Sequence, residues 1–195
     1  MQIMKTVGKQ VLFISTTESN PRNGETSMIR LKDGAVLLAY TQYYAGDWLD
    51  HGAARLMACR SEDEGETWSE PFLLLDKDET AQNYMSPSLI RLKDGALGML
   101  WLRKHASESG MCCMPVFARS DDEGRTWSPY VFCVTEPGYY CGTNDSVVVL
   151  KSGRIMAPVS HVGSVDAFKA GIVRFICSDD NGQTWFTLDT AVVSP

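Results

Sequence analysis

An eight-residue motif occurs three times in this chain, and its spacing constrains the fold more than any other feature. The copies share the pattern Ser-x-Asp-x-Gly-x-Thr-Trp and begin at Ser61, Ser120 and Ser178, so the intervals are 59 and 58 residues. Repeats of this length with a tight turn in each copy are typical of β-sheet modules such as propeller blades. In each copy the Asp can accept backbone N–H bonds, the Gly can adopt a positive φ, and the Trp can pack between sheets. This motif, called here the Asp turn, therefore predicts repeated all-β modules.

A second repeated turn supports the same interpretation. Asp33-Gly34, Asp94-Gly95 and Ser152-Gly153 each follow a Leu-Lys pair and separate two apolar segments, as a hairpin turn does. The strands expected around these turns are 27–31 and 35–40, 88–92 and 96–101, and 146–150 and 154–159. A third strand is expected at 55–60, 114–119 and 171–177, and a fourth from the Trp of each Asp turn. No segment has the pattern of a helix.

These repeats divide the chain into three modules of four strands, at about 24–80, 81–140 and 141–195. The apolar segment within 10–16 is predicted to be an outer strand that closes a further module. In an up-and-down module the two repeated turns lie at one edge, so the variable loops gather at the opposite edge. A ligand is therefore expected among the variable loops, which are 41–52, 102–112 and 160–170, with the crossovers 18–26, 76–86 and 136–145.

Alignment of the modules on their Gly turns selects equivalent polar positions near that edge. Eight residues before the turn residues lie Glu25, Ser86 and Asn144, and nine residues after them lie Gln42, Arg103 and His161. All six sit beside mostly apolar strands, and we predict that they face a ligand. Polar residues also occur at strand ends simply because water is there, so this second interpretation stays open.

Composition excludes several classes of function. The net charge is −6, the pI is about 5.0, and Lys and Arg form no cluster, which argues against nucleic-acid binding. No apolar run approaches about 18 residues, so no membrane span is expected. The first fifteen residues lack the features of a signal peptide, which favours a cytoplasmic location and leaves secretion open. Three His and six Cys show no metal-ligand or disulfide spacing, so we expect no cofactor, and we expect the Cys to be small buried side chains.

At the Asp turns the chain resembles the sialidase superfamily with BNR or Asp-box repeats, over about residues 24–190. The resemblance implies a six-bladed β-propeller of four-stranded antiparallel blades, with the active site at the centre of one face. It also implies that Asp63, Asp122 and Asp180, on the other face, are structural. About three of six blades fit into 195 residues. We therefore expect either the N-terminal part of a longer protein, inactive alone, or two copies that associate to close a ring.

The same resemblance assigns site residues. It implies that Asp50 is the catalytic acid/base, with Asp47 in the same loop as a rival, and that the nucleophilic Tyr–Glu pair lies in the absent half. The chain departs from the family at three places. The Arg-Ile-Pro segment of the family corresponds to Gly24-Glu25-Thr26, and the Arg that usually follows the second strand is replaced by the segment Gln42-Tyr43-Tyr44. A further family Asp corresponds to Ser86. Arg22 would substitute for the first missing Arg only through a shift of its loop.

Two functions follow from this pattern. The first is a sialidase-like exo-glycoside hydrolase that acts on terminal sugars of glycans. The second, favoured by the missing Arg residues, is a non-catalytic propeller that binds glycans or another protein, so whether the chain belongs to an enzyme is left open. The candidate substrate-binding residues are Glu25, Gln42, Asp47, His51, Ser86, Arg103, Asn144, Asp145 and His161.

Overall fold

The computed structural model describes residues 8–108, 110–142, 144–162 and 172–193, which form β-strands and no helix. Blade I contains β1 (Arg22–Arg30), β2 (Val36–Tyr43), β3 (Ala54–Ser61) and β4 (Phe72–Leu75). Blade II contains β5 (Asn83–Arg91), β6 (Leu97–Ser107), β7 (Gly110–Ser120) and β8 (Val131–Phe132). Blade III contains β9 (Tyr140–Cys141), β10 (Val148–Val149), β11 (Ile155–His161), β12 (Ile172–Ser178) and β13 (Phe186–Val193). Over these ranges the chain forms no helix that could cross a membrane.

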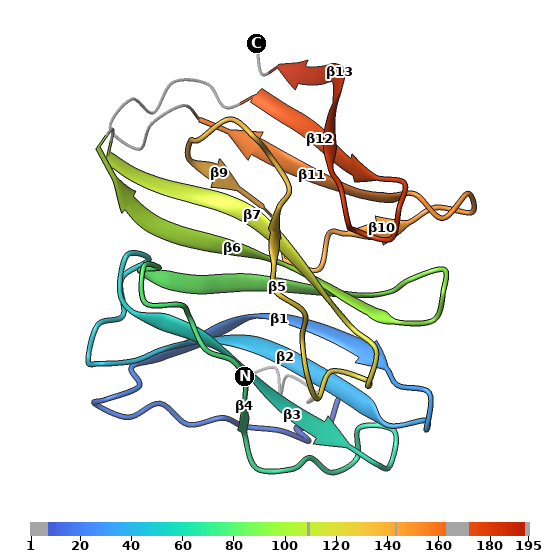
Figure 1. Cartoon of the computed structure of the whole chain (residues 1–195). Coiled ribbons are helices and arrows are strands. Elements are labelled where there is room, and N and C mark those ends of the chain that lie inside the picture. The colour runs from blue at the N-terminus through green and yellow to red at the C-terminus, as the bar shows by residue number, and fades with distance from the viewer. Residues whose placement is uncertain (1–7, 109, 143, 163–171, 194–195) are drawn as a thin grey trace, which may run out of the picture.

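The three blades follow one another along the chain and stack side by side (Figure 1). Within each blade neighbouring strands pair antiparallel, while blades I and II are joined by a single parallel bridge between Ala54 and Asn83. The hairpin turns and Asp turns lie at one edge, on the right in Figure 1, and the described parts of the loops that follow β2 and β6 lie at the opposite edge. The prediction of an all-β chain with three four-stranded propeller blades is therefore confirmed.

Some strand boundaries differ from the sequence-based expectation. The outer strands β4 and β8 begin four residues after Trp68 and Trp127, because the residues in between complete the Asp turn. The inner strand of blade III is split into β9 and β10. The segment within 10–16, expected to be an outer strand that closes a further module, pairs with none of the described strands, so this expectation stays a prediction. Leu12 and Ile14 pack against the apolar face of blade I that points away from blade II.

The Asp turns have one geometry in all three blades. In blade II, Asp122 accepts hydrogen bonds from the amide of Thr126 (2.8 Å) and from its hydroxyl (2.6 Å), and the amide of Gly124 donates to Ser120 Oγ (2.8 Å). The Thr126 hydroxyl bond, together with the backbone bond, lowers the pKa of Asp122 to about 2. Each Asp carboxylate is thus occupied by its own turn, as the structural role implied by the resemblance requires.

The glycine of an Asp turn also forms the contact between blades. Gly182 has a φ of +87°, and a Cβ added there would lie 2.0 Å from Cε1 of Phe117 in blade II. Gly124 lies in the same way over Leu37 of blade I, with a Cβ position 3.1 Å from Leu37 Cδ2. Polar bonds accompany this contact, since Glu123 accepts from the amide of Lys32 in the preceding blade. The Asp turn therefore fixes the position of each blade relative to the preceding blade.

Behind these turns, apolar side chains fill the space between neighbouring blades. Between blades I and II the core includes Leu37, Ala39, Leu97, Met99 and Trp101. Between blades II and III it includes Leu100, Phe117, Ile155, Ala157 and Ile176. Successive side chains of a strand point to opposite faces of the sheet, so alternate residues pack into different cores. Whether a residue is odd or even in its strand therefore determines which face of the blade it lies on.

Replacement of Gly182 by Ala tests the contact between blades, with Gly65→Ala as its matched control. Both glycines have a positive φ, but a Cβ on Gly65 meets only Trp68 of its own turn at 3.8 Å. We expect Gly65→Ala to cost about 1 kcal/mol of unfolding free energy from backbone strain alone. Gly182→Ala should cost about 2–4 kcal/mol, because overpacking against Phe117 is added. Urea unfolding measures both, and equal losses would contradict the proposed contact.

Candidate functional site

A hollow of about 220 Å³ lies at the loop edge, where the inner strands of the three blades approach one another. Its walls come from all three blades and from the loop between β2 and β3. The lining residues are Glu25, Asp50, Met85, Ser86, Leu102, Lys104, Cys113, Tyr139, Tyr140, Cys141, Gly142 and Asn144. This set, called here the axial hollow, joins acidic, basic and aromatic side chains in one place.

A left-handed residue interrupts the inner strand of each blade at this edge. Glu25, Ser86 and Asp145 have φ values of 57°, 57° and 53°, although none of them is glycine. The first two lie at shifts in the register of β1 with β2 and of β5 with β6, as in a β-bulge. Left-handed residues other than glycine are strained and concentrate at functional sites. The alignment on Gly turns selected Asn144 in blade III, whereas the left-handed residue is the next one, Asp145.

Arg22 connects the polar residues at one wall of the axial hollow. Its guanidinium donates to Asp50 Oδ1 at 2.5 Å and to Glu25 Oε1 at 3.1 Å. It also lies over the ring of Tyr43, 4.2 Å from the ring centre. The second carboxylate oxygen of Glu25 accepts the amide of Ser86 at 3.2 Å, so the cluster spans blades I and II. Arg22 reaches this place by its side chain, so the loop shift expected from the sequence is not needed.

This cluster sets the protonation of the two groups beside Arg22. The hydrogen bond from Arg22 lowers the pKa of Asp50 below its ordinary value of 3.8, so Asp50 is ionised at neutral pH. Burial, together with the nearby Glu25, raises the pKa of Tyr43 above its ordinary value of 10, so its phenol stays protonated. The Asp50 side chain is 60% exposed and can be reached from solvent.

Two residues of blade II hold the loop that carries Asp50. Asn83 is fully buried, and its Nδ2 donates to the backbone oxygens of Asp50 at 3.0 Å and Gly52 at 2.8 Å. Lys104 is also buried, and its Nζ donates to the same Asp50 oxygen at 2.7 Å. The sequence analysis missed both residues. The available signal was a polar residue within a strand that otherwise reads as apolar.

The structure brings together part of the residues selected from the sequence. Glu25, Asp50, Ser86 and Asn144 line the axial hollow. At its rim, the His51 ring lies edge-on to Tyr139, and Asp145 accepts a hydrogen bond from the Ser27 hydroxyl at 2.7 Å. Asp47 instead caps its own loop, since its Oδ1 accepts the amide of Leu49 at 2.9 Å. Their roles in binding remain predictions.

Gln42, Arg103 and His161 do not line the axial hollow, so their expected position there needs correction. Arg103 is 4% exposed and forms two bonds of 2.9 Å to Asp78. Gln42 accepts two bonds from Arg55, and His161 stacks on Tyr140 at 4.4 Å. The cause is strand parity: these positions lie on the same side of the second strand as Trp101, which faces the preceding blade.

The described residues contain no group of three or more His, Cys, Asp or Glu arranged to hold a metal ion. All six cysteines are free, and five of them are buried, as small apolar side chains would be. The sixth, Cys141, is exposed and lines the axial hollow. Besides this thiol, the site offers the carboxylates of Asp50 and Glu25, the Arg22 guanidinium, the Lys104 ammonium group and tyrosine phenols for its chemistry.

Comparison with known proteins adds the family context. A family model described as BNR/Asp-box repeat matches residues 176–187, which contain the whole third Asp turn. No curated protein matches the sequence. Among solved structures, the Hadza microbial sialidase Hz136 is similar, with a TM-score of 0.69 and 18% identity over 87% of this chain and 38% of that chain. The fold is that of the sialidase β-propeller.

Other solved structures support this sialidase-type fold. A protein of unknown function from Dyadobacter fermentans DSM 18053 has a TM-score of 0.71 and 22% identity, over 89% of this chain and 56% of that chain. The intramolecular trans-sialidase from Ruminococcus gnavus has a TM-score of 0.66 and 13% identity, over 96% and 64%. The present chain thus spans between 38% and 64% of the length of these three. The resemblance seen in the sequence is confirmed for the repeat and the fold.

Replacement of Asn83 by Asp tests the support of the Asp50 loop. The change keeps the shape of the side chain but places a carboxylate oxygen against two backbone oxygens in a buried site. We expect a loss of about 2–4 kcal/mol of unfolding free energy. The control is Asn144→Asp, which is exposed and should change stability by less than about 0.5 kcal/mol. Denaturant unfolding compares them, and equal effects would refute the support by Asn83.

The bond between Arg22 and Asp50 has a measurable pH dependence. In the wild type, the lowered pKa of Asp50 means that this bond stabilises the fold at neutral pH and is lost as the pH falls through that pKa. Arg22→Ala should raise the pKa of Asp50 and remove this acid-dependent contribution. Carboxyl NMR titration measures the shift, with Arg30→Ala, at an Arg that is 72% exposed, as the control. An unchanged Asp50 titration in Arg22→Ala would contradict the assignment.

Proposed function

We propose that this chain supplies the acid/base half of a sialidase-type exo-glycoside hydrolase that acts on terminal sugars of glycans. The observation that carries the proposal is the position of Asp50, at the rim of the axial hollow and beside Arg22 and Glu25. The sialidase-type fold supports it, because the resemblance implies an active site at the centre of the loop face. Carboxyl groups at such a site can serve glycoside hydrolysis as acid and base.

Arg22 would control when Asp50 can donate a proton. While Asp50 accepts the Arg22 bond, its pKa is lowered and the group can act only as a base. A substrate that forms hydrogen bonds with Arg22 would release Asp50, and its pKa would then rise toward the range needed for a general acid. Substrate binding and protonation of the leaving oxygen would thus be coupled through one guanidinium.

The charges at the hollow indicate how the sugar would be held. Arg22 and Lys104 are balanced by Asp50 and Glu25, and Arg22 already contacts both carboxylates. The described residues that line this hollow include no arginine, so they offer no free guanidiniums to bind a sugar carboxylate. We therefore propose recognition through sugar hydroxyls, with Glu25 and Asn144 as hydrogen-bonding groups. Trp48, which is 64% exposed in the Asp50 loop, can stack on a sugar face.

One observation favours a second candidate, a non-catalytic glycan-binding propeller. Asp50 is held ionised by Arg22, and an ionised carboxylate accepts hydroxyl hydrogen bonds without any transfer of a proton. Such a protein would bind a glycan at the axial hollow and release no product. The measurement that follows separates the two candidates.

Asp50→Asn should lower turnover of aryl glycosides and glycans by about 10²–10⁴-fold in the full-length protein, because the general acid/base is removed. Asp47→Asn is the matched control, since Asp47 lies in the same loop but bonds only to it. Product release is measured by chromatography, and glycan binding by calorimetry. Full turnover in Asp50→Asn would refute the role of Asp50. Binding without product release in the wild type would establish the non-catalytic candidate.

A further inference from the structure

The space between blades I and II is filled by aromatic side chains on its outer side. Trp101 is fully buried there, with ring centres 5.4 Å from Tyr84 and 5.9 Å from Tyr130. The bidentate pair of Arg103 and Asp78 closes the same region, and the hydroxyls of both Tyr also donate to Asp78.

The equivalent space between blades II and III is open. In blade II, Trp101 pairs with Val116 across neighbouring strands. At the equivalent position of blade III, Val159 pairs with Arg174. Blade III thus has a small side chain where blade II has an indole, and a charged one where blade II has Val116. The result is a hollow of about 400 Å³, larger than the axial hollow. It is called here the interblade hollow.

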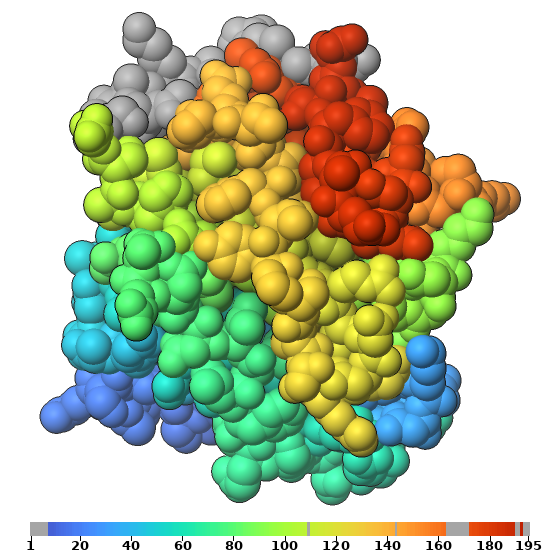
Figure 2. Space-filling view, in the orientation of Figure 1, coloured from blue at the N-terminus to red at the C-terminus, as the bar shows by residue number. Residues whose placement is uncertain are grey.

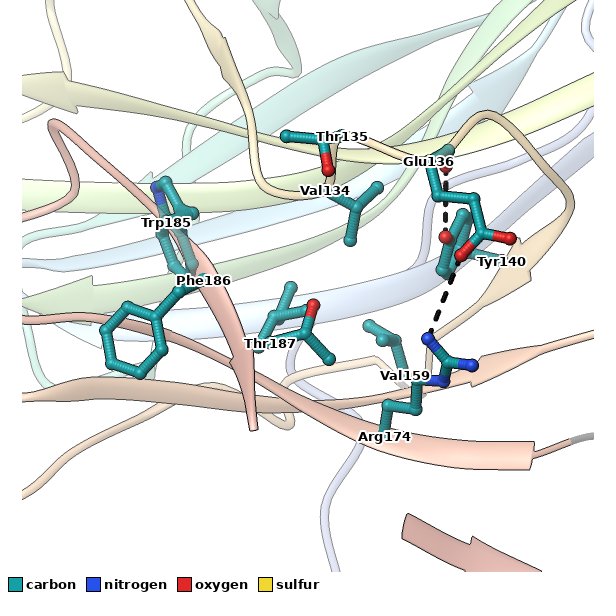
Figure 3. A pocket seen from close by; sticks show the side chains of 10 residues that line it. Val134, Thr135, Glu136, Tyr140, Val159, Arg174, Trp185, Phe186 and Thr187 are labelled. Atoms are coloured by element: carbon teal, nitrogen blue, oxygen red, sulfur yellow. Dashed lines mark hydrogen bonds and ion pairs between the residues drawn. The ribbon is translucent and has the colours of Figure 1, made fainter. Parts of the chain in front are cut away.

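The walls of the interblade hollow combine hydrogen-bonding groups with aromatic rings (Figure 3). On one side Glu136 faces Arg174, with 3.8 Å between carboxylate and guanidinium, and both side chains remain partly exposed. On the other side lies Trp185, whereas the ring of Phe186 points away from the hollow and lies 5.4 Å from the Arg154 guanidinium. The hydroxyls of Thr135 and Thr187 complete the polar part of the lining.

The position of this hollow keeps it separate from the proposed active site. It lies between the crossover that follows β8 and the outer strand β13, which are neighbours on the face in view in Figure 2. The axial hollow instead opens between the inner strands. Of the residues that line either hollow, only Tyr140 belongs to both.

We propose that the interblade hollow is a second binding site, for a neutral sugar residue. Glu136 and Arg174 cancel each other's charge, so an ionic ligand gains no net attraction, while a neutral polyol finds acceptors and donors together. Adjacent hydroxyls of a pyranose suit the two-pronged geometry of a carboxylate and a guanidinium, and the ring of Trp185 suits its apolar face. This inference uses no property of Asp50 and holds whether or not the axial site is catalytic.

The test is titration of the full chain with lactose, observed at the indole N–H signal of Trp185 by NMR. We expect a saturable shift with lactose and none with N-acetylneuraminic acid at the same concentration. Val159→Trp should weaken lactose binding at least about 10-fold, because it places the side chain of blade II in the hollow. Arg174→Val, which also installs the blade II residue, should weaken it similarly and serves if Val159→Trp does not fold.

Asp50→Asn is the control for the axial hollow and should leave the Trp185 titration unchanged. Loss of lactose binding at Trp185 in Asp50→Asn would overturn the assignment to a separate site. So would a wild-type chain that shows no saturable shift with lactose, or folded Val159→Trp and Arg174→Val variants that bind as the wild type does. None of these outcomes depends on turnover, so failure here is distinguishable from failure of the proposed hydrolase.

Discussion

The contact between an Asp-turn glycine and an apolar side chain of the preceding blade is the constraint on which this structure depends. A Cβ on Gly182 would overlap the Phe117 ring, and a Cβ on Gly124 would lie only 3.1 Å from Leu37 Cδ2. The left-handed turn is in turn held by the Asp and Thr side chains of the motif. Because this edge is fixed at each blade, the opposite edges of the blades converge at a defined angle and distance. The functional loops can therefore vary in length without any change in the arrangement of the sheets.

The axial hollow shows what this arrangement makes possible. Asp50 belongs to a loop of blade I, yet Asn83 and Lys104 of blade II hold the backbone of that loop. Glu25 of blade I likewise accepts the amide of Ser86 from blade II. The backbone of the Asp50 loop is thus held by blade II, while the Asp50 carboxylate is held by Arg22 of its own blade. Blade I alone would carry Asp50 but would lack the bonds that hold its loop.

The sequence predicted the features that depend on local chemistry. The Asp turns, the hairpin turns and the order of strands follow from Asp, Gly and Trp at fixed spacing, and they predict the sheets and the edge where a site lies. Glu25 and Ser86 were selected by their equivalent distance from the hairpin turns, and Asp50 by the family resemblance; the three residues line one hollow, and their roles remain predictions. Arg22 was judged too far away, because the reach of its side chain across two carboxylates is not visible in a linear pattern.

The remaining differences come from long-range packing. Gln42, Arg103 and His161 are polar at the expected distance from the turn. Strand alternation, however, turns Arg103 and His161 toward the preceding blade, and Gln42 toward the face of blade I that points away from blade II. The segment within 10–16 has the composition of a strand but pairs with none of the described strands. Asn83 and Lys104 matter through bonds to a loop more than thirty residues away, and no local motif encodes such bonds.

The three left-handed residues of the inner strands give the scaffold an unusual freedom to evolve. At Glu25, Ser86 and Asp145 the backbone has already departed from the regular extended conformation. Exchange of these side chains would therefore disturb few ladder hydrogen bonds, while it would change the charge presented at the centre of the loop face. A lineage of such proteins could alter its ligand preference through three codons, with the strand pairing within each blade unchanged.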